Sequence, residues 1–140
     1  MGNSSVIFLL IGVLILAVVF ILYISMARKS SPKLNQEKFQ SRWLAIENSI
    51  SRDNVAACHL AIINADKLLD QALKDAHYKG DKMADRMKSA DSKWRNANHI
   101  WTAHKIRNKL AHEPDAKGSY DLTLQTLSAF KQGLKDLGAI

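Results

Sequence analysis

Three residues near the end of one predicted helix carry groups that could cut a phosphodiester bond. Arg107 and Asn108 are adjacent, and His112 follows in the same stretch, RNKLAH. A histidine can transfer protons near neutral pH, and a guanidinium can hold two phosphate oxygens while negative charge builds on them. These residue types therefore predict phosphate binding with proton transfer, a combination that would cleave RNA without a metal ion.

The spacing of these residues decides how they could work together. Asn108 and His112 are four residues apart, so they lie on one face of a helix, where Asn108 could orient the imidazole. Arg107 and His112 are about 140° apart around an ideal helix, so one chain does not bring them together by itself. We therefore expect a homodimer in which Arg107 of one chain works with His112 of the other.

Two further residues are accessory candidates, His104 on the same side of the helix and Glu113 at its end. A structural role is an open alternative for the main candidates, because Arg107 and His112 could cap carbonyls or pair with Asp66 or Asp70. No set of His and Cys residues has the spacing of a metal site, so neither a metal nor a cofactor is expected.

The soluble part of the chain has helical periodicity throughout and no strand pattern, which predicts an all-α bundle of four to five helices. Asn35 begins the domain, Asp53 or Asn54 can cap the second helix, and Ser92 and Ser119 can cap later ones. A short, weakly apolar helix is expected to lie on the surface, and Pro114 should end the helix of interest near His112. The expected helices are 35–51, 54–78, 81–90, 94–112 and one that follows Ser119.

The first residues have a different character. Residues 5–27 contain no charged residue and are long enough to cross a bilayer as one helix, leaving residues 1–4 as a short N-terminus on the far side. A cleaved signal peptide fits less well, because no positive charge precedes the apolar run and the run is long. Arg28 and Lys29 follow it in a basic linker, residues 28–34, and this asymmetry predicts a single-pass membrane protein with a cytoplasmic domain at residues 35–140.

The net charge of +7 belongs entirely to the part after the apolar segment. The segment from Lys79 to Lys109 holds an excess of Lys and Arg over Asp, which favours polyanions such as RNA or anionic lipid headgroups. A solvated basic face is the plain alternative. The single cysteine, Cys58, excludes an internal disulfide and falls in an apolar stripe, so it is expected in the core.

The stretch RNKLAH resembles the signature of HEPN domains, in which an arginine and a polar residue precede a histidine after a short spacer. The resemblance extends more loosely over residues 35–137 and leaves the apolar segment outside it. It implies a small all-α domain of nucleic-acid biology, in which two protomers bring their signatures together in a cleft. Many members of this family cleave RNA without a metal ion, whereas others only bind.

Together with the apolar segment, the resemblance implies a membrane-anchored endoribonuclease that uses Arg107, Asn108 and His112. A toxin or defence effector under the control of a regulatory protein partner is the expected role. The alternative is a module without catalysis that binds nucleotide, RNA or protein at the membrane. A third interpretation is a structural membrane protein whose basic face contacts lipids.

Overall fold

The fold is that of a computed structural model, which describes residues 2–27, 33–113 and 118–140, with side chains for 6–24, 33–113 and 118–140. Most of the expected basic linker, as well as Pro114, lies outside these residues. The chain divides into two compact units, residues 1–31 and 32–140, and each is described by itself. The described residues contain helices and no strands, so the prediction of an all-α fold is confirmed.

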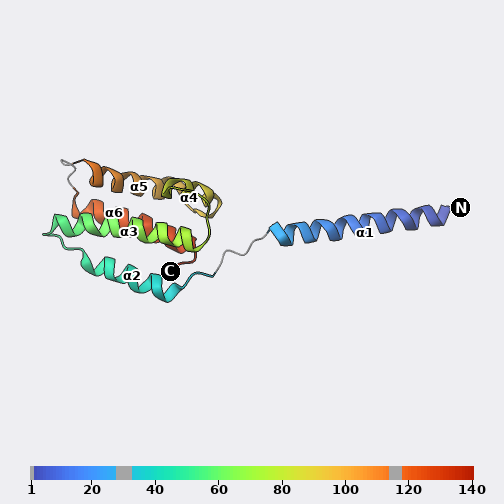
Figure 1. The fold of residues 1–140 in the computed structure, drawn as a ribbon, viewed down its shortest axis with the longest axis horizontal. Coiled ribbons are helices and arrows are strands. Elements are labelled where there is room, and N and C mark those ends of the chain that lie inside the picture. Colours follow the sequence, from blue (N-terminus) through green and yellow to red (C-terminus); the bar gives the residue numbers. More distant parts are fainter. Residues whose placement is uncertain (1, 28–32, 114–117) are drawn as a thin grey trace. The chain divides into compact units, whose positions relative to one another are not determined.

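The first unit contains α1 (Gly2–Ala27), shown in blue in Figure 1. Its segment Val6–Ile24 has a mean hydropathy of 3.3, and none of it is buried against other parts of the chain. Apolar side chains are exposed on every side of this helix. The sequence prediction of one helix long and apolar enough to cross a membrane is therefore confirmed.

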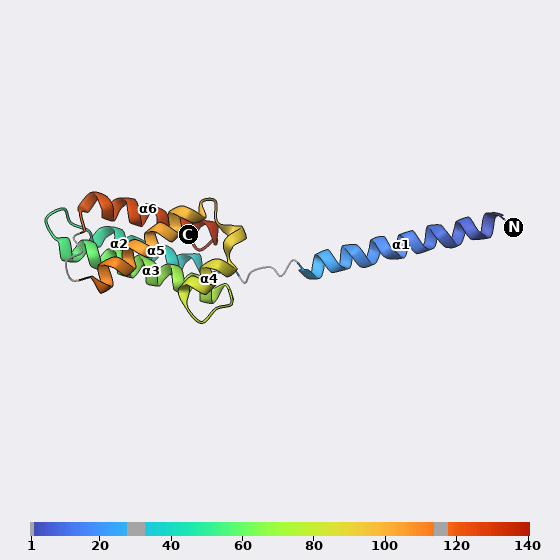
Figure 2. The ribbon, with the colours of Figure 1, turned by 90° about the horizontal axis from the view of Figure 1, so that it is seen from above.

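The second unit is a helical bundle. Its elements are α2 (Gln36–Ser49), α3 (Val55–Asp75), α4 (Met83–Ser89), the short 3-10 helix η1 (Asp91–Lys93), α5 (Ala97–His112) and α6 (Tyr120–Asp136). Helix α3 occupies the centre: Figure 1 shows it between α2 and α5, and it also packs against α4 and α6. Helices α5 and α6 pack against each other as well, as Figure 2 shows from above.

The bundle has its own hydrophobic core. Among the side chains that the structure describes, the buried apolar ones run from Leu34 to Ala139, and full burial of one large side chain contributes about 1.5–3 kcal/mol. Cys58 is buried, as its place in the apolar stripe predicts. Residues 33–140 therefore hold the contacts needed to fold independently of α1. The largest fully buried apolar side chains come from five helices: Phe39, Ile62, Leu69, Leu73, Met87, Ile100, Phe130 and Leu134.

Local capping explains why most helices begin where the sequence predicts. The side chains of Asn35, Asn54 and Ser119 accept hydrogen bonds from the backbone N–H of Lys38, Ala57 and Leu122 at 3.0, 2.9 and 3.1 Å. Each bond satisfies a donor that the first turn of a helix leaves free. These three N-termini are confirmed.

The end of α3 comes slightly earlier than the predicted Tyr78. His77 adopts a left-handed conformation with φ of 60°, and the N–H of Tyr78 bonds to the carbonyl of Leu73 at 3.0 Å. This is a Schellman motif, which closes the last turn and redirects the chain.

The surface position expected for residues 81–90 is correct for one side of the helix, and the other side is buried. Met87 and Ala90 are fully buried, and Met83 is 9% exposed. Arg86 of α4 explains the difference, because its Nε and Nη2 donate to Oδ1 of Asp70 at 2.8 and 2.7 Å. Its Nη1 donates to the carbonyl of Gly80 at 2.6 Å, so the guanidinium holds α4 and the preceding loop against α3.

Gly80 makes this arrangement possible, because its φ of +151° is rare for residues with a side chain. A Cβ atom there would lie 2.6 Å from Cβ of Asp85 and 2.7 Å from the backbone nitrogen of Arg86. Real Cβ atoms essentially never lie this close to atoms that are not bonded to them, so only glycine fits at this turn.

The predicted start of α5 at Trp94, with Ser92 as its cap, is also wrong. Residues 91–93 form η1, Trp94 is extended, and Asn96 caps α5 by accepting from the N–H of His99 at 3.1 Å. The Trp94 indole is buried and donates to the carbonyl of Met87 at 2.9 Å. Trp94 therefore attaches α4 to the bundle rather than belonging to the face of α5.

Candidate functional site

Four side chains form a closed ring of polar contacts where α5 packs against α3. Nδ1 of His104 lies 2.7 Å from Oδ1 of Asp66, and Nε2 of His104 lies 3.2 Å from Nδ2 of Asn108. Nη1 of Arg107 donates to Oδ1 of Asn108 at 2.9 Å. Nε of Arg107 lies 3.2 Å from Oδ2 of Asp66, which returns to the starting residue.

The ring has one consistent direction of donation. A carboxylate only accepts, so the proton of His104 must be on Nδ1, and Nε2 of a neutral ring can then accept from the Asn108 amide. That orientation leaves the Asn108 oxygen facing Arg107, as observed. The contacts therefore assign the tautomer of His104 and the rotamer of Asn108 together.

Two members of this ring are buried, so their polar atoms need partners within the protein. Asp66 and His104 are 3% and 8% exposed, and a buried carboxylate requires partners to offset its loss of hydration. Trp101 covers one side, because its ring meets that of His104 edge to face at a centroid distance of 6.4 Å. Trp101 and His104 thus lie on one side of α5 with Asn108, as the helical spacing predicts.

Arg107 is held in the ring, but only one of its nitrogens donates a hydrogen bond there. Its Nε is close enough to Asp66 for an ion pair but does not point at the carboxylate, and among the described residues this buried nitrogen has no hydrogen-bond partner. The distance from Nε to Oδ2 would suit a hydrogen bond, but the direction of the N–H does not. The contact is therefore a charge interaction rather than a hydrogen bond. The Arg107 side chain is 24% exposed, so part of its guanidinium can be reached from outside.

His112 and Glu113 lie outside the ring. Both are exposed at the end of α5, where Glu113 is extended and its N–H bonds to the Lys109 carbonyl at 2.9 Å. The Glu113 carboxylate lies 3.8 Å from Nζ of Lys109, and no contact joins His112 to Arg107 in the part of the chain that the structure describes. The structure thus brings together Arg107, Asn108 and His104, and leaves His112 separate within one chain.

The sequence pattern suggested Asp66 only as a possible structural partner of Arg107 or His112, although Asp66 completes the ring. A signal was present, because Asp66 lies on the same face as Ile62 and Leu69, both of which are fully buried. A carboxylate within an apolar stripe requires a buried partner, and α5 supplies two.

The basic segment from Lys79 to Lys109 is less positive than its sequence suggests. Arg86, Arg95 and Arg107 pair with Asp70, Asp136 and Asp66, and Lys109 pairs with Glu113. Five lysines, residues 79, 82, 88, 93 and 105, have no ion pair among the described residues. The attraction for polyanions that these residues supply is therefore weaker than a count of charges indicates.

The described ranges 2–27, 33–113 and 118–140 contain no group of three His, Cys, Asp or Glu side chains that could hold a metal ion. Comparisons with protein-family models, curated proteins and solved structures gave no match. The interpretation of the site therefore depends on its own geometry and on the residues that form it.

Proposed function

We propose that this chain is a membrane-anchored HEPN-type endoribonuclease that works as a homodimer. The observation that carries the proposal is the ring of Asp66, His104, Asn108 and Arg107, which holds a partly exposed guanidinium on the helix that ends in an exposed His112. Fixed orientation of this kind is what stabilisation of a transition state requires, because the groups need not reorganise during reaction.

In the proposed reaction, His112 of one chain removes the proton of a ribose 2′-hydroxyl. The 2′-oxygen attacks phosphorus, and the bond from phosphorus to the 5′-oxygen breaks. The leaving 5′-oxygen takes a proton from the imidazolium of a protonated His112. Arg107 of the other chain binds the phosphate oxygens as their charge increases. The products are a 2′,3′-cyclic phosphate and a 5′-hydroxyl, and Asn108 and His104 keep the guanidinium in position.

The test uses unstructured RNA and the purified chain in detergent with EDTA present. His112→Ala should lower the cleavage rate by about 10²- to 10⁴-fold, the usual contribution of a general acid or base. Arg107→Ala should lower it by about 10²- to 10³-fold. The matched control is His77→Ala, which removes an exposed histidine at the end of α3 and should retain full activity.

A mixture of two inactive variants tests the composite site. If Arg107 and His112 come from different chains, Arg107→Ala mixed with His112→Ala regenerates one intact site in each mixed dimer, or about a quarter of the original activity. If both residues act within one chain, no activity returns. Absence of cleavage by the unmodified chain, or a strictly monomeric chain, would remove the nuclease proposal.

A second candidate is a non-catalytic module that binds RNA or nucleotide. The observation that favours it is the ion pair between Arg107 and Asp66, which neutralises part of the charge that a catalyst would use. Salt-sensitive RNA binding that Arg107→Ala weakens, with no cleavage at any concentration, would support this module.

The proposal also assigns α1 as a single-pass anchor with the helical domain in the cytoplasm. It is supported by the mean hydropathy of 3.3 over Val6–Ile24 and by Arg28, Lys29 and Lys33, which follow the apolar run, whereas no basic residue precedes it. The full-length chain should remain uncleaved and leave the membrane fraction with detergent but not with alkaline carbonate. A shortened, freely soluble product would instead identify α1 as a signal sequence.

A further inference from the structure

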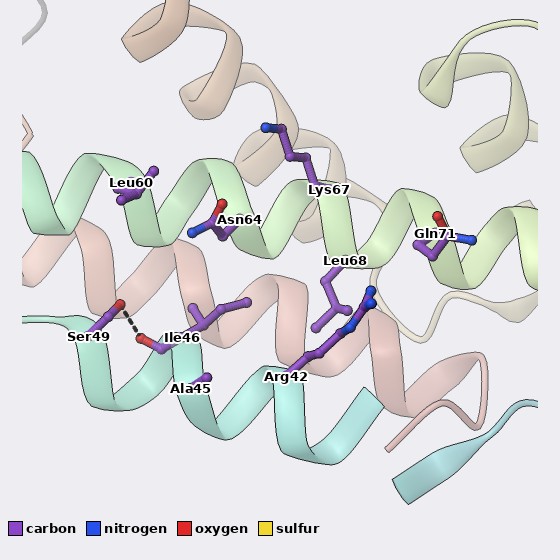
Figure 3. A pocket seen from close by; sticks show the side chains of 9 residues that line it. All are labelled: Arg42, Ala45, Ile46, Ser49, Leu60, Asn64, Lys67, Leu68 and Gln71. Atoms are coloured by element: carbon purple, nitrogen blue, oxygen red, sulfur yellow. Dashed lines mark hydrogen bonds between the residues drawn. The ribbon is translucent and has the colours of Figure 1, made fainter. Parts of the chain in front are cut away.

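A second surface of the domain is a groove between α2 and α3, with a volume of about 450 Å³. Figure 3 shows its lining, in which Ile46, Leu60 and Leu68 are apolar and Asn64 is polar. Leu60 is 57% exposed, so a large apolar side chain lies uncovered at this groove. The ring of Asp66, His104, Asn108 and Arg107 contributes no side chain to the lining.

The groove is cationic. Arg42 from α2 and Lys67 from α3 line it, and neither has an ion pair among the residues that the structure describes. No carboxylate lines it, whereas Arg86, Arg95 and Arg107 are each paired with an aspartate. In Figure 3, Arg42 extends from α2 toward α3, while Lys67 rises from the side of α3 farther from α2. The two cations thus flank an apolar floor.

The groove also has the length of a short helix. Leu60, Asn64, Lys67 and Gln71 recur at spacings of four, three and four residues, so they form one stripe along α3. This stripe is about 16 Å long, or three helical turns. The facing wall from α2 includes Ala45 and Ser49, whose small side chains permit close approach.

We propose that this groove binds an acidic amphipathic helix of a partner protein. Leucine-like residues on one face of that helix would cover Leu60, Ile46 and Leu68, and carboxylates on its flanks would pair with Arg42 and Lys67. A second copy of this chain fits less well, because a symmetric contact would bring the same two cations together. Single-stranded RNA also fits less well, since the groove has no aromatic side chain on which a base could stack.

The experiment uses isotope-labelled residues 33–140, which carry their own core, and a synthetic acidic helical peptide of about 18 residues with leucine every third or fourth position. The same peptide with lysine in place of every glutamate is its control. We expect saturable binding of the acidic peptide alone, with amide shifts confined to α2 and α3. Arg42→Glu combined with Lys67→Glu should weaken binding at least tenfold, and Leu60→Ser should weaken it independently of salt.

The matched control is Lys79→Glu combined with Lys88→Glu, which reverses two exposed lysines near α4 and should leave binding unchanged. Equal binding of both peptides, amide shifts outside the groove, or no saturation at about 1 mM would overturn the proposal. Self-association or RNA binding that disappears with the Arg42 and Lys67 reversals would assign the groove to a different occupant. None of these outcomes depends on RNA cleavage.

Discussion

Asp66 and Asp70 lie one turn apart on α3, and each contacts an arginine from a later helix. The two arginines differ in how many hydrogen bonds they donate and in how exposed they are. Arg86 gives three hydrogen bonds, two to Asp70 and one to the Gly80 carbonyl, and its side chain is 8% exposed. Arg107 gives one, to Asn108, and its side chain is 24% exposed. Arg86 has the pattern of a structural residue, and Arg107 has donors left for a ligand.

The partners of the two carboxylates differ as well. Asp70 is also paired with Lys74 at 2.8 Å, so its surroundings are two permanent cations. Asp66 is paired with one permanent cation and accepts a hydrogen bond from the imidazole of His104. Asp70 is therefore held by two cations, whereas Asp66 also depends on the orientation of an imidazole ring.

The largest effect is expected when Arg86 is replaced by methionine, which keeps much of the volume and removes the charge. The variant leaves Asp70 with Lys74 alone and the Gly80 carbonyl without its donor, so the free energy of unfolding should fall by about 3–5 kcal/mol. Urea denaturation of residues 33–140 measures this change. A loss below about 1 kcal/mol would contradict the structural role assigned to Arg86.

Replacement of Asp66 by alanine should have the next largest effect. It leaves the Nδ1 proton of His104 without its acceptor and the Arg107 guanidinium without its counter-charge, which should cost about 2–3 kcal/mol. Nitrogen NMR of the His104 ring should also report a change of tautomer. An unchanged ring spectrum would mean that Asp66 does not fix the imidazole.

Arg107→Met is the direct counterpart of Arg86→Met and should cost only about 1–2 kcal/mol, because the lost hydrogen bond is a single one at a partly exposed site. The measurement is the same urea denaturation series. Equal losses for Arg86→Met and Arg107→Met would remove the distinction between the two pairs.

The smallest effect is expected at the surface pair of Glu47 and Lys131, which are 2.6 Å apart and more than a third exposed. Burial acts to raise the pKa of Glu47, but the hydrogen bond from Lys131 and the charges of Lys131 and Lys135 hold that pKa below its usual value. A lowered pKa in the folded state gives stability that is present above the unfolded pKa and is lost as pH falls through the folded pKa.

Lys131→Gln should therefore lower stability at pH 7 by about 0.5 kcal/mol or less, since solvent screens exposed pairs. The difference from the unmodified domain should disappear as Glu47 becomes protonated in acid. A difference that persists below the folded pKa would show that Lys131 acts through packing on Trp43, over whose ring its Nζ lies at 5.8 Å.

These comparisons also explain which parts of the fold the sequence could predict. The starts of α2, α3 and α6 depend on Asn35, Asn54 and Ser119, whose bonds reach only three residues along the chain. The placement of α4 depends on Arg86 and Asp70, which are sixteen residues apart, and on the Trp94 indole. Local patterns contain the first kind of information and not the second, so the contact of Arg86 with Asp70 was not predicted.

The same division applies to the candidate site. Helical spacing alone places His104 and Asn108 on one side of α5, and the structure has them in contact. The role of Asp66 depends on how α3 packs against α5 across 38 residues of sequence, which spacing cannot supply. The separation of Arg107 from His112 within one chain follows from helix geometry, and cooperation between two chains stays a prediction.

Gly80 limits how this domain can vary. The turn that it occupies has no space for even one additional carbon, because the backbone of Arg86 fills the position where that carbon would be. The side chains of its neighbours Lys79 and Asp81 are exposed, so the restriction falls on Gly80 itself. A label or a regulatory segment inserted at this turn would therefore unseat α4.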